Sequence, residues 1–414
     1  MKRRVVVTGM GLVTPVGNDV PSSWRALLDG ASGGGPITHF DAAQHRVRFA
    51  CEVKGFDPLH YMDKKEVKRS DLYTRYALAA SVQAMQDAGF GDSTGYDPNE
   101  FGVIIGSGIG GINTFEEQLD VARTMGPNRV SAFFVPMFIG DIAAGVVSMR
   151  YGLKGPNYAT QSACATSAHA IGEAYRTIQY GDAVVMVAGG SEAAVSEMAV
   201  AGFANMQALS YNNEHPTTAS RPFDATRDGF VLGEGAGIVV LEELEHARAR
   251  GATIHGEIVG YGSTGDAYHL TGQPEDHEGL QRAMRKALKD AGLAPEDIQY
   301  VNAHGTSTAM NDPNEIRAIK KVFGDHARTL NVSSTKSSTG HTLGAAGGLE
   351  FVFTALAIRD GIIPPTINLT QQDPECDLNC TPLVAVKREL TTAISNSSGF
   401  GGHNVAIAVK RFEG

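Results

Sequence analysis

"QDAGF" at residues 86–90 and "KDAGL" at residues 289–293 close two similar segments, one in each half of the 414-residue chain. Apolar side chains recur at helical spacing in both segments, on Leu78, Val82 and Met85 in the first and on Leu280, Met284, Leu288 and Ala291 in the second. A short predicted strand and a polar or glycine-rich turn follow each time, as "FGVIIGSGIGG" from residue 101 and "IQYVNAHGTST" from residue 298. The sequence therefore contains an internal repeat.

The repeat continues toward the end of each half. "SACATSAHAIGEAYRTIQYGD" from residue 162 and "SSTKSSTGHTLGAAGGLEFVFTALAIRDG" from residue 333 each predict a buried helix that opens from a turn of small residues. "GFVLGEGAGIVVLEE" from residue 229 and "GFGGHNVAIAVK" from residue 399 each place a glycine-rich turn before an apolar strand. Continuous apolar runs such as 184–188 are typical of strands covered on both faces. We therefore predict a layered α/β fold of two similar halves, residues 1–250 and 251–414.

Composition and charge exclude several classes of protein. The net charge of −10 and the lack of a recognisable motif argue against nucleic acid as a partner. Thr8, Gly9 and Thr14 interrupt the basic and apolar start of the chain too early for a signal peptide. No apolar run approaches the ~18 residues of a membrane span. We expect a cytoplasmic protein that does not enter a membrane.

Four cysteines without a C-x-x-C pair do not make a disulfide framework in a chain of this length. Cys376 and Cys380 could touch, which leaves a disulfide or a metal there as a minor alternative. Cys164 differs from them, because small residues surround it at a predicted strand-to-helix turn. A small buried hydrophobe is the plain interpretation of such a cysteine. A helix N-terminus, however, favours the thiolate and would lower the thiol pKa from about 8.5, so Cys164 is a candidate nucleophile.

Two histidines stand in turns of small and hydroxyl residues, His304 in "NAHGTST" and His341 in "SSTKSSTGHTLGAAGG", with Lys336 five residues before the second. Either histidine alone would more often be structural. The pair has no H-x-x-x-H partner, so no metal site is predicted. "GSGIGG" from residue 106 satisfies G-x-G-x-x-G after a strand, but no helix opens at once and no acidic residue ends the next strand. A nicotinamide or flavin site is therefore not expected.

In order and spacing, "SACATS", "NAHGTST", "SSTKSSTGH" and "NSSGFGGHN" make the chain resemble the thiolase-fold condensing enzymes, among them the β-ketoacyl-[acyl-carrier-protein] synthases of type II. The resemblance covers essentially the whole chain. It implies two similar βαβαβαββ halves stacked as a five-layered αβαβα structure, and a homodimer. It also implies acyl transfer to a cysteine, followed by decarboxylative Claisen condensation with malonyl-acyl carrier protein in fatty acid elongation. No cofactor and no metal are expected, because two neutral imidazoles, on His304 and His341, would supply the N–H donors for the developing charge. The substrates arrive on the carrier's phosphopantetheine arm.

The resemblance assigns a role to each matching residue. Cys164 is the nucleophile, and its backbone N–H and that of Phe400 form the oxyanion hole. His304 and His341 stabilise the enolate, Lys336 keeps them uncharged, and Thr306 and Thr308 hold the phosphopantetheine arm. The acyl pocket and its entrance are lined by Ile109, Phe203 and Phe400. Three carboxylates near the lysine also match the family, namely Asp312, Glu315 and Glu350.

The basic run "KKEVKR", residues 64–69, coincides with the family's docking patch for the acidic carrier protein, which implies roles for Lys65, Lys68 and Arg69. A solvated helix face is the plain alternative. Two positions depart from the family: Ser398 stands where many relatives have phenylalanine, and Gln207 replaces an arginine that some relatives use against the carrier.

Other condensing enzymes fit the sequence less well. A thiolase needs a second reactive cysteine near the C-terminal turn, and no cysteine follows Cys380. The initiating synthases replace one histidine by asparagine, and the non-catalytic chain-length subunit lacks the nucleophilic cysteine. A polyketide ketosynthase shares the cysteine and both histidines, so this alternative stays open.

Overall fold

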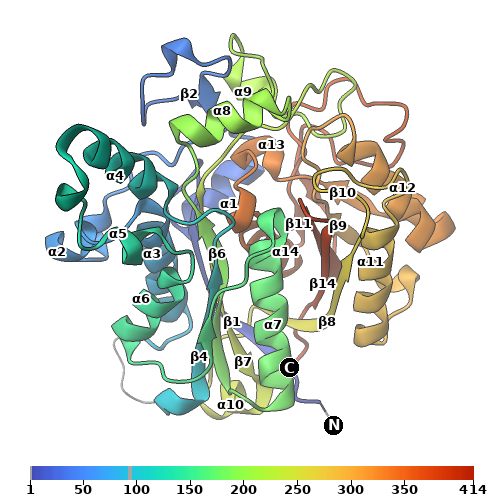
Figure 1. Cartoon of the computed structure of the whole chain (residues 1–414). Helices are drawn as coiled ribbons and strands as arrows, with labels where there is room; N and C mark the ends of the chain where they lie inside the picture. Colours follow the sequence, from blue (N-terminus) through green and yellow to red (C-terminus); the bar gives the residue numbers. More distant parts are fainter. Residues whose placement is uncertain (1, 92–95) are drawn as a thin grey trace.

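The computed structural model describes residues 2–91 and 96–414 (Figure 1). Its main sheet runs in the order β10-β9-β13-β14-β8-β1-β7-β6-β4-β5. The strands from the first half of the chain are β1 (Val5–Val13), β4 (Phe101–Gly106), β5 (Asn157–Tyr158), β6 (Val185–Glu192) and β7 (Gly235–Glu243). Those from the second half are β8 (Gly256–Gly265), β9 (Tyr300–Asn302), β10 (Asn331–Ser333), β13 (Thr392–Gly399) and β14 (His403–Lys410). Short two-stranded sheets pair β2 (Gly35–Pro36) with β3 (Phe49–Ala50), and β11 (Ile362–Ile363) with β12 (Val386–Lys387).

The predicted repeat is present in the strand pairing. In the first half β7 lies antiparallel between β1 and β6, and β4 lies parallel between β6 and β5. In the second half β14 lies antiparallel between β8 and β13, and β9 lies parallel between β13 and β10. The two sets meet where Val5, Val6 and Val7 of β1 pair with β8. The change from one set to the other falls at α10 (Leu244–Ala249), although a domain boundary at residue 250 itself stays a prediction.

Helices cover both sets of strands and fill the space between them (Figure 1). Helices α3 (Leu72–Asp87) and α6 (Ile142–Tyr151) lie outside the first set, and α11 (Glu278–Ala291) and α12 (Asn311–Phe323) lie outside the second. Helices α7 (Thr166–Tyr180) and α14 (Ala346–Asp360) lie between the sets and contact each other. These are the five layers that the resemblance implied.

The sequences of the helices explain their layers. Helix α14 carries apolar residues all round and is buried from Ala346 through Ile358, as a central helix must be. Helix α11 is amphipathic, with Leu280, Met284 and Leu288 buried and charged residues facing solvent. The paired central helices also end alike, at Gly181 (φ +88°) and Gly361 (φ +64°), in the left-handed conformation that glycine adopts without strain.

The remaining helices lie around this core. They are α1 (Val20–Leu28), α2 (Lys64–Val67), α4 (Ile112–Met125), α5 (Phe134–Phe138), α8 (Glu197–Asn205), α9 (Pro216–Ala219) and α13 (Lys336–Thr339). Among the described residues, no helix is long and apolar enough to cross a membrane. Figure 1 shows α8, α9 and α13 at one end of the layers, near the N-terminal ends of α7 and α14. The candidate active site lies at this end.

Candidate active site

One cavity of about 310 Å³ brings together most of the residues that the sequence singled out. Its walls include Cys164 from the first half and His304 and His341 from the second. The remaining predicted site residues on its walls are Phe203, Thr306, Thr308 and Phe400, and the two departures Gln207 and Ser398 also line it. The two halves therefore share one site, which forms only because they pack together.

Cys164 lies in a tight turn just before α7. The turn is a short 3-10 segment, Ala163–Ala165, and Ala163 adopts a left-handed φ of +50° that is unusual for a residue other than glycine. Such backbone strain is concentrated at functional sites. Gly399 packs directly against this turn, since a Cβ there would lie 2.6 Å from the Ser162 carbonyl oxygen and 3.0 Å from the Cys164 nitrogen. The Phe400 N–H faces the Cys164 sulfur as a hydrogen-bond donor.

The expected lowering of the Cys164 thiol pKa is wrong in direction. The side chain is buried, and burial raises the pKa of the thiol to about 12, because removal from water disfavours the thiolate. The Lys336 ammonium and the Phe400 N–H act against this rise but are outweighed, while the Glu192 carboxylate adds to it. The resting residue is thus a thiol, and its attack on a substrate requires a proton acceptor.

His304 and His341 lie edge to face, with ring centroids 5.3 Å apart and planes at 86°. Burial lowers the pKa of both imidazoles well below 6.5, and the Lys336 ammonium lowers it further. Both rings are therefore neutral at physiological pH. The expectation that Lys336 helps to keep them uncharged is confirmed for both.

Lys336 is buried at the base of the site rather than solvated. Its Nζ donates to the His304 carbonyl oxygen at 2.6 Å, lies 3.3 Å from His304 Nδ1, and forms an ion pair with Glu350 Oε1. Because an ammonium group can only donate, the Nδ1 it faces is the acceptor and Nε2 carries the imidazole proton. Glu315 fixes the same loop by accepting the backbone N–H groups of His304 at 2.9 Å and Gly305 at 2.8 Å.

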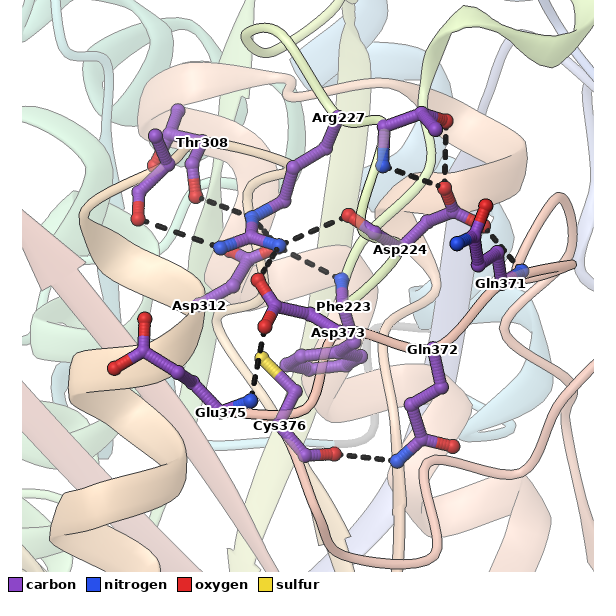
Figure 2. Close-up of polar contacts among 12 residues, drawn as sticks. Phe223, Asp224, Arg227, Thr308, Asp312, Gln371, Gln372, Asp373, Glu375 and Cys376 are labelled. Carbon is purple, nitrogen blue, oxygen red and sulfur yellow. Dashed lines mark hydrogen bonds and ion pairs between the residues drawn. The ribbon is translucent and has the colours of Figure 1, made fainter.

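A buried charged network holds the Thr306–Thr308 loop, and Figure 2 shows its centre at Arg227. The guanidinium donates to the Thr308 carbonyl oxygen at 2.9 Å and to Asp373 at 2.6 Å, and it lies 3.7 Å from Asp312. Asp312 in turn accepts the Ser307 N–H at 3.2 Å, and Ser307 has a left-handed φ of +69°. The network thereby orients two hydroxyls of the cavity wall, whose oxygens on Thr306 and Thr308 are 2.9 Å apart.

Of the three apolar residues expected to line the acyl pocket, two lie on the cavity wall and one does not. Phe203 and Phe400 line the cavity, and the Phe203 ring packs against Phe230, which in turn contacts the His341 ring. Ile109 is not among the cavity-lining residues. It is partly buried and packs against the apolar cluster that contains Cys164.

The carboxylate of Glu192 binds the glycine-rich turn that follows β4. Glu192 accepts hydrogen bonds from the backbone N–H groups of Gly108 at 2.8 Å, Ile109 at 3.2 Å and Gly344 at 2.9 Å, and from the Ser107 hydroxyl at 2.7 Å. A buried carboxylate therefore occupies the donors that a phosphate would need. Helix α4 begins only at Ile112, which also departs from a dinucleotide site.

Other candidates lie outside the cavity. Cys376 and Cys380 are both free and buried. Within residues 2–91 and 96–414, no group of three or more histidine, cysteine or acidic side chains could hold a metal ion. Lys65, Lys68 and Arg69 are exposed on and next to α2, where the Arg69 guanidinium lies 4.3 Å from the Phe133 ring centroid.

Sequence analysis missed several residues of the site. Arg227 and Glu192 carried no motif signal, because their partners are distant in sequence. Phe230 and Leu343 also line the cavity, and Leu343 has a left-handed φ of +47° before α14, as Ala163 has before α7. The internal repeat could have found Leu343, since it occupies the corresponding turn.

Comparisons with known proteins identify the family of the chain. The family model described as Beta-ketoacyl synthase, N-terminal domain, matches residues 2–247, and the Beta-ketoacyl synthase, C-terminal domain, matches residues 255–370. A Synechocystis protein named 3-oxoacyl-[acyl-carrier-protein] synthase 2 is 50% identical over 412 residues, which are 100% of this chain and 99% of the relative.

Two solved structures have the same fold over their full lengths. A Beta-ketoacyl synthase from Burkholderia phymatum STM815 matches with a TM-score of 0.93 and 38% identity, and each chain is 100% covered. A chain from a type II PKS acyl-carrier protein in complex with its ketosynthase matches with a TM-score of 0.92 and 36% identity, again with 100% of each chain covered. On these matches and on the shared cavity, the chain belongs to the beta-ketoacyl synthase family.

Proposed function

We propose that Cys164, His304 and His341 carry out decarboxylative condensation of malonyl-acyl carrier protein with an acyl group held on the cysteine. The product is a 3-oxoacyl thioester two carbons longer, as in fatty acid elongation, and the enzyme is an acyltransferase. One observation carries the assignment of residues: a cysteine from one half and two neutral histidines from the other line the same cavity.

The first half-reaction is acyl transfer. The Cys164 sulfur forms a bond to the acyl carbonyl carbon, and the bond from that carbon to the carrier's sulfur breaks. The thiol proton ends on the departing phosphopantetheine thiolate, and a neutral imidazole lining the cavity is suited to pass it there. The N–H groups of Cys164 and Phe400 bind the oxyanion, a contribution typically worth ~3 kcal/mol for each donor.

The second half-reaction begins when malonyl thioester loses carbon dioxide and negative charge develops on the thioester oxygen. His304 presents its Nε2–H because Lys336 faces Nδ1, so it can donate to that oxygen without itself being charged. With His341 as the second donor, no cofactor or metal is part of the proposed reaction. The enolate carbon then bonds to the acyl carbonyl carbon, and Cys164 leaves as a thiolate that takes up a proton.

The proposal includes an acidic carrier protein as the partner that delivers both substrates. The exposed cations of Lys65, Lys68 and Arg69 support a docking role, and a solved relative is a ketosynthase complex with its acyl-carrier protein. Reversing all three charges to glutamate should raise the KM for carrier-bound substrates most at low salt, where steering is strongest. No change between about 20 and about 300 mM salt would contradict docking at this patch.

A homodimer is also part of the proposal, and the cytoplasm is its expected location. Strand β5 forms an open edge of the main sheet and carries Tyr158, which is 44% exposed. Apolar side chains on α4 and α5 are exposed as well, namely Phe115, Val135 and Phe138. An unpaired sheet edge and exposed apolar side chains each favour pairing with a second copy. Light scattering should give twice the monomer mass, and a monomer at micromolar concentration would contradict this assembly.

The decisive experiment incubates the protein with acyl- and malonyl-loaded carrier protein and weighs the products. The proposal predicts an acyl adduct on Cys164 and a single extension by two carbons. Repeated extension without reduction of the 3-oxo group would favour a polyketide ketosynthase instead, the second candidate that the ketosynthase relative supports.

A further inference from the structure

His277 is a buried histidine that the proposed reaction does not use. It is fully buried in the turn before α11 and adopts a left-handed φ of +47°, which places its ring inward between α11 and the C-terminal strands. Its Nε2 lies 2.9 Å from Asn404 Oδ1 and 3.3 Å from Ser398 Oγ. The ring therefore contacts Ser398, a residue of the cavity wall.

Ser398 and Asn404 are cross-strand partners at the base of the turn that joins β13 to β14. The Ser398 hydroxyl donates to Asn404 Oδ1 at 2.9 Å, which ties the two sides of the turn together. The other side of the Asn404 amide donates to Asp266 Oδ1 at 2.6 Å. The turn between them holds Phe400, whose N–H faces the Cys164 sulfur.

The hydrogen-bond pattern fixes the state of the imidazole. Asn404 directs its NH₂ group to the Asp266 carboxylate, so the atom that faces His277 Nε2 is its oxygen, which can only accept. Nε2 consequently carries the proton, and burial keeps the ring neutral by lowering its pKa to about 4. His277 is thus a fixed donor at the base of the turn.

We infer that His277 is a positioning residue, whose Nε2–H holds Ser398 and Asn404 so that the turn presents the Phe400 N–H to Cys164. The inference rests on the proposed function, in which that N–H stabilises the oxyanion of acyl transfer. His277 and Ser398 are also a matched pair. With the imidazole 3.3 Å from the serine oxygen, a larger side chain that extends from position 398 in this direction would meet the ring.

The test compares two steps of the same enzyme. His277→Ala should slow acylation of Cys164 by about 10- to 100-fold, because small displacements of a catalytic group are costly. Malonyl decarboxylation, which depends on His304 and His341, should change far less. His277→Gln, which retains an N–H donor, should recover part of the acylation rate. His326→Ala is the control, since the His326 ring bonds the Ile298 carbonyl oxygen elsewhere in the second half and His326 lies outside the cavity lining.

Variants at Ser398 test the same role if His277→Ala is unstable. Ser398→Ala leaves the ring in place and removes one link, so a smaller loss confined to acylation is expected. Ser398→Phe should be strongly impaired alone and improved when combined with His277→Gly, which removes the ring and suits a left-handed φ. Equal loss of both steps in His277→Ala and Ser398→Ala, or no improvement in the double variant, would overturn the positioning role.

Iodoacetamide separates this inference from the proposed function, because alkylation of Cys164 needs no carrier protein. Loss of the Phe400 N–H contact should slow alkylation in His277→Ala relative to the unaltered protein. Unchanged alkylation in that variant would count against the inference. An unaltered protein that is alkylated normally but never acylated would instead contradict the proposed function.

Discussion

The Lys336 ammonium lies 3.3 Å from Nδ1 of His304 and donates at 2.6 Å to the carbonyl oxygen of the same residue. This double contact fixes the position of the histidine and the nitrogen that carries its proton. It also lowers the imidazole pKa, because a nearby cation disfavours a second positive charge. The site therefore provides a neutral N–H donor for the negative charge that develops on the thioester oxygen during decarboxylation.

The two histidines should be separable from the cysteine by substitution. His304→Ala and His341→Ala are each expected to reduce malonyl decarboxylation by about 10²- to 10³-fold, because each removes one donor to the enolate oxygen. An acyl adduct on Cys164 should remain detectable by intact mass in both variants, because each keeps one neutral imidazole that can pass the thiol proton. Loss of acylation with normal decarboxylation would contradict these roles.

Cys164→Ala should give the opposite result. The variant cannot form an acyl-enzyme, so acyl transfer and condensation are expected to fall to background. Decarboxylation should persist, because both imidazoles remain on the cavity wall. Carbon dioxide release from malonyl-carrier protein measures this step, and undiminished condensation by the variant would rule out Cys164 as the nucleophile.

A noncatalytic histidine should make stability depend on pH. His169 bonds Ser162 and Ser263 at 2.7 and 2.9 Å, and burial lowers its pKa to about 4. Below about pH 6.5 this histidine binds a proton in the unfolded chain, whereas in the folded chain it stays neutral until about pH 4. The contribution of neutral His169 to the free energy of unfolding is therefore lost as pH falls from about 6.5 to about 4. The slope contributed by this one group approaches ~1.4 kcal/mol per pH unit.

Urea unfolding of His169→Gln measures this contribution. The variant cannot take up the proton in either state, so its free energy of unfolding should fall less steeply than that of the unaltered protein between pH 6.5 and about 4. The difference in slope isolates His169 from the other buried histidines. Parallel slopes for the two proteins would show that its pKa is not lowered by folding.

The sequence predicted those parts of the fold that depend on local periodicity. The helical spacing around Leu280 and Met284 and the apolar run in α14 determined which helices lie outside and which lie in the centre. The predicted strand at 184–188 is β6, which extends to Glu192 because it stays paired with β7 as far as Gly235. No local pattern indicates such a long-range partner.

The site was predicted in part for the same reason. Motifs identified the cysteine and histidines, and the repeat indicated that they come from different halves. The thiol pKa of Cys164 was predicted in the wrong direction, because a helix start can be read from sequence but the extent of burial cannot. Arg227 was missed, since its acceptors on Thr308 and Asp373 come from loops distant in sequence.

Ile109 is expected to limit the length of the acyl chain. This residue packs beside the cluster that contains Cys164, and its N–H donates to Glu192 at 3.2 Å, so the loop cannot shift freely to accept a larger side chain. Ile109→Phe should overpack this region at a cost of ~1 to 3 kcal/mol, or roughly 10- to 100-fold in selectivity against long chains. We expect impaired elongation of acyl groups beyond about six to eight carbons, with shorter groups spared. Ile109→Val is the matched control without added bulk. Product profiles across a primer series decide the matter, because equal loss at every length would assign residue 109 to the general core and not to the acyl pocket.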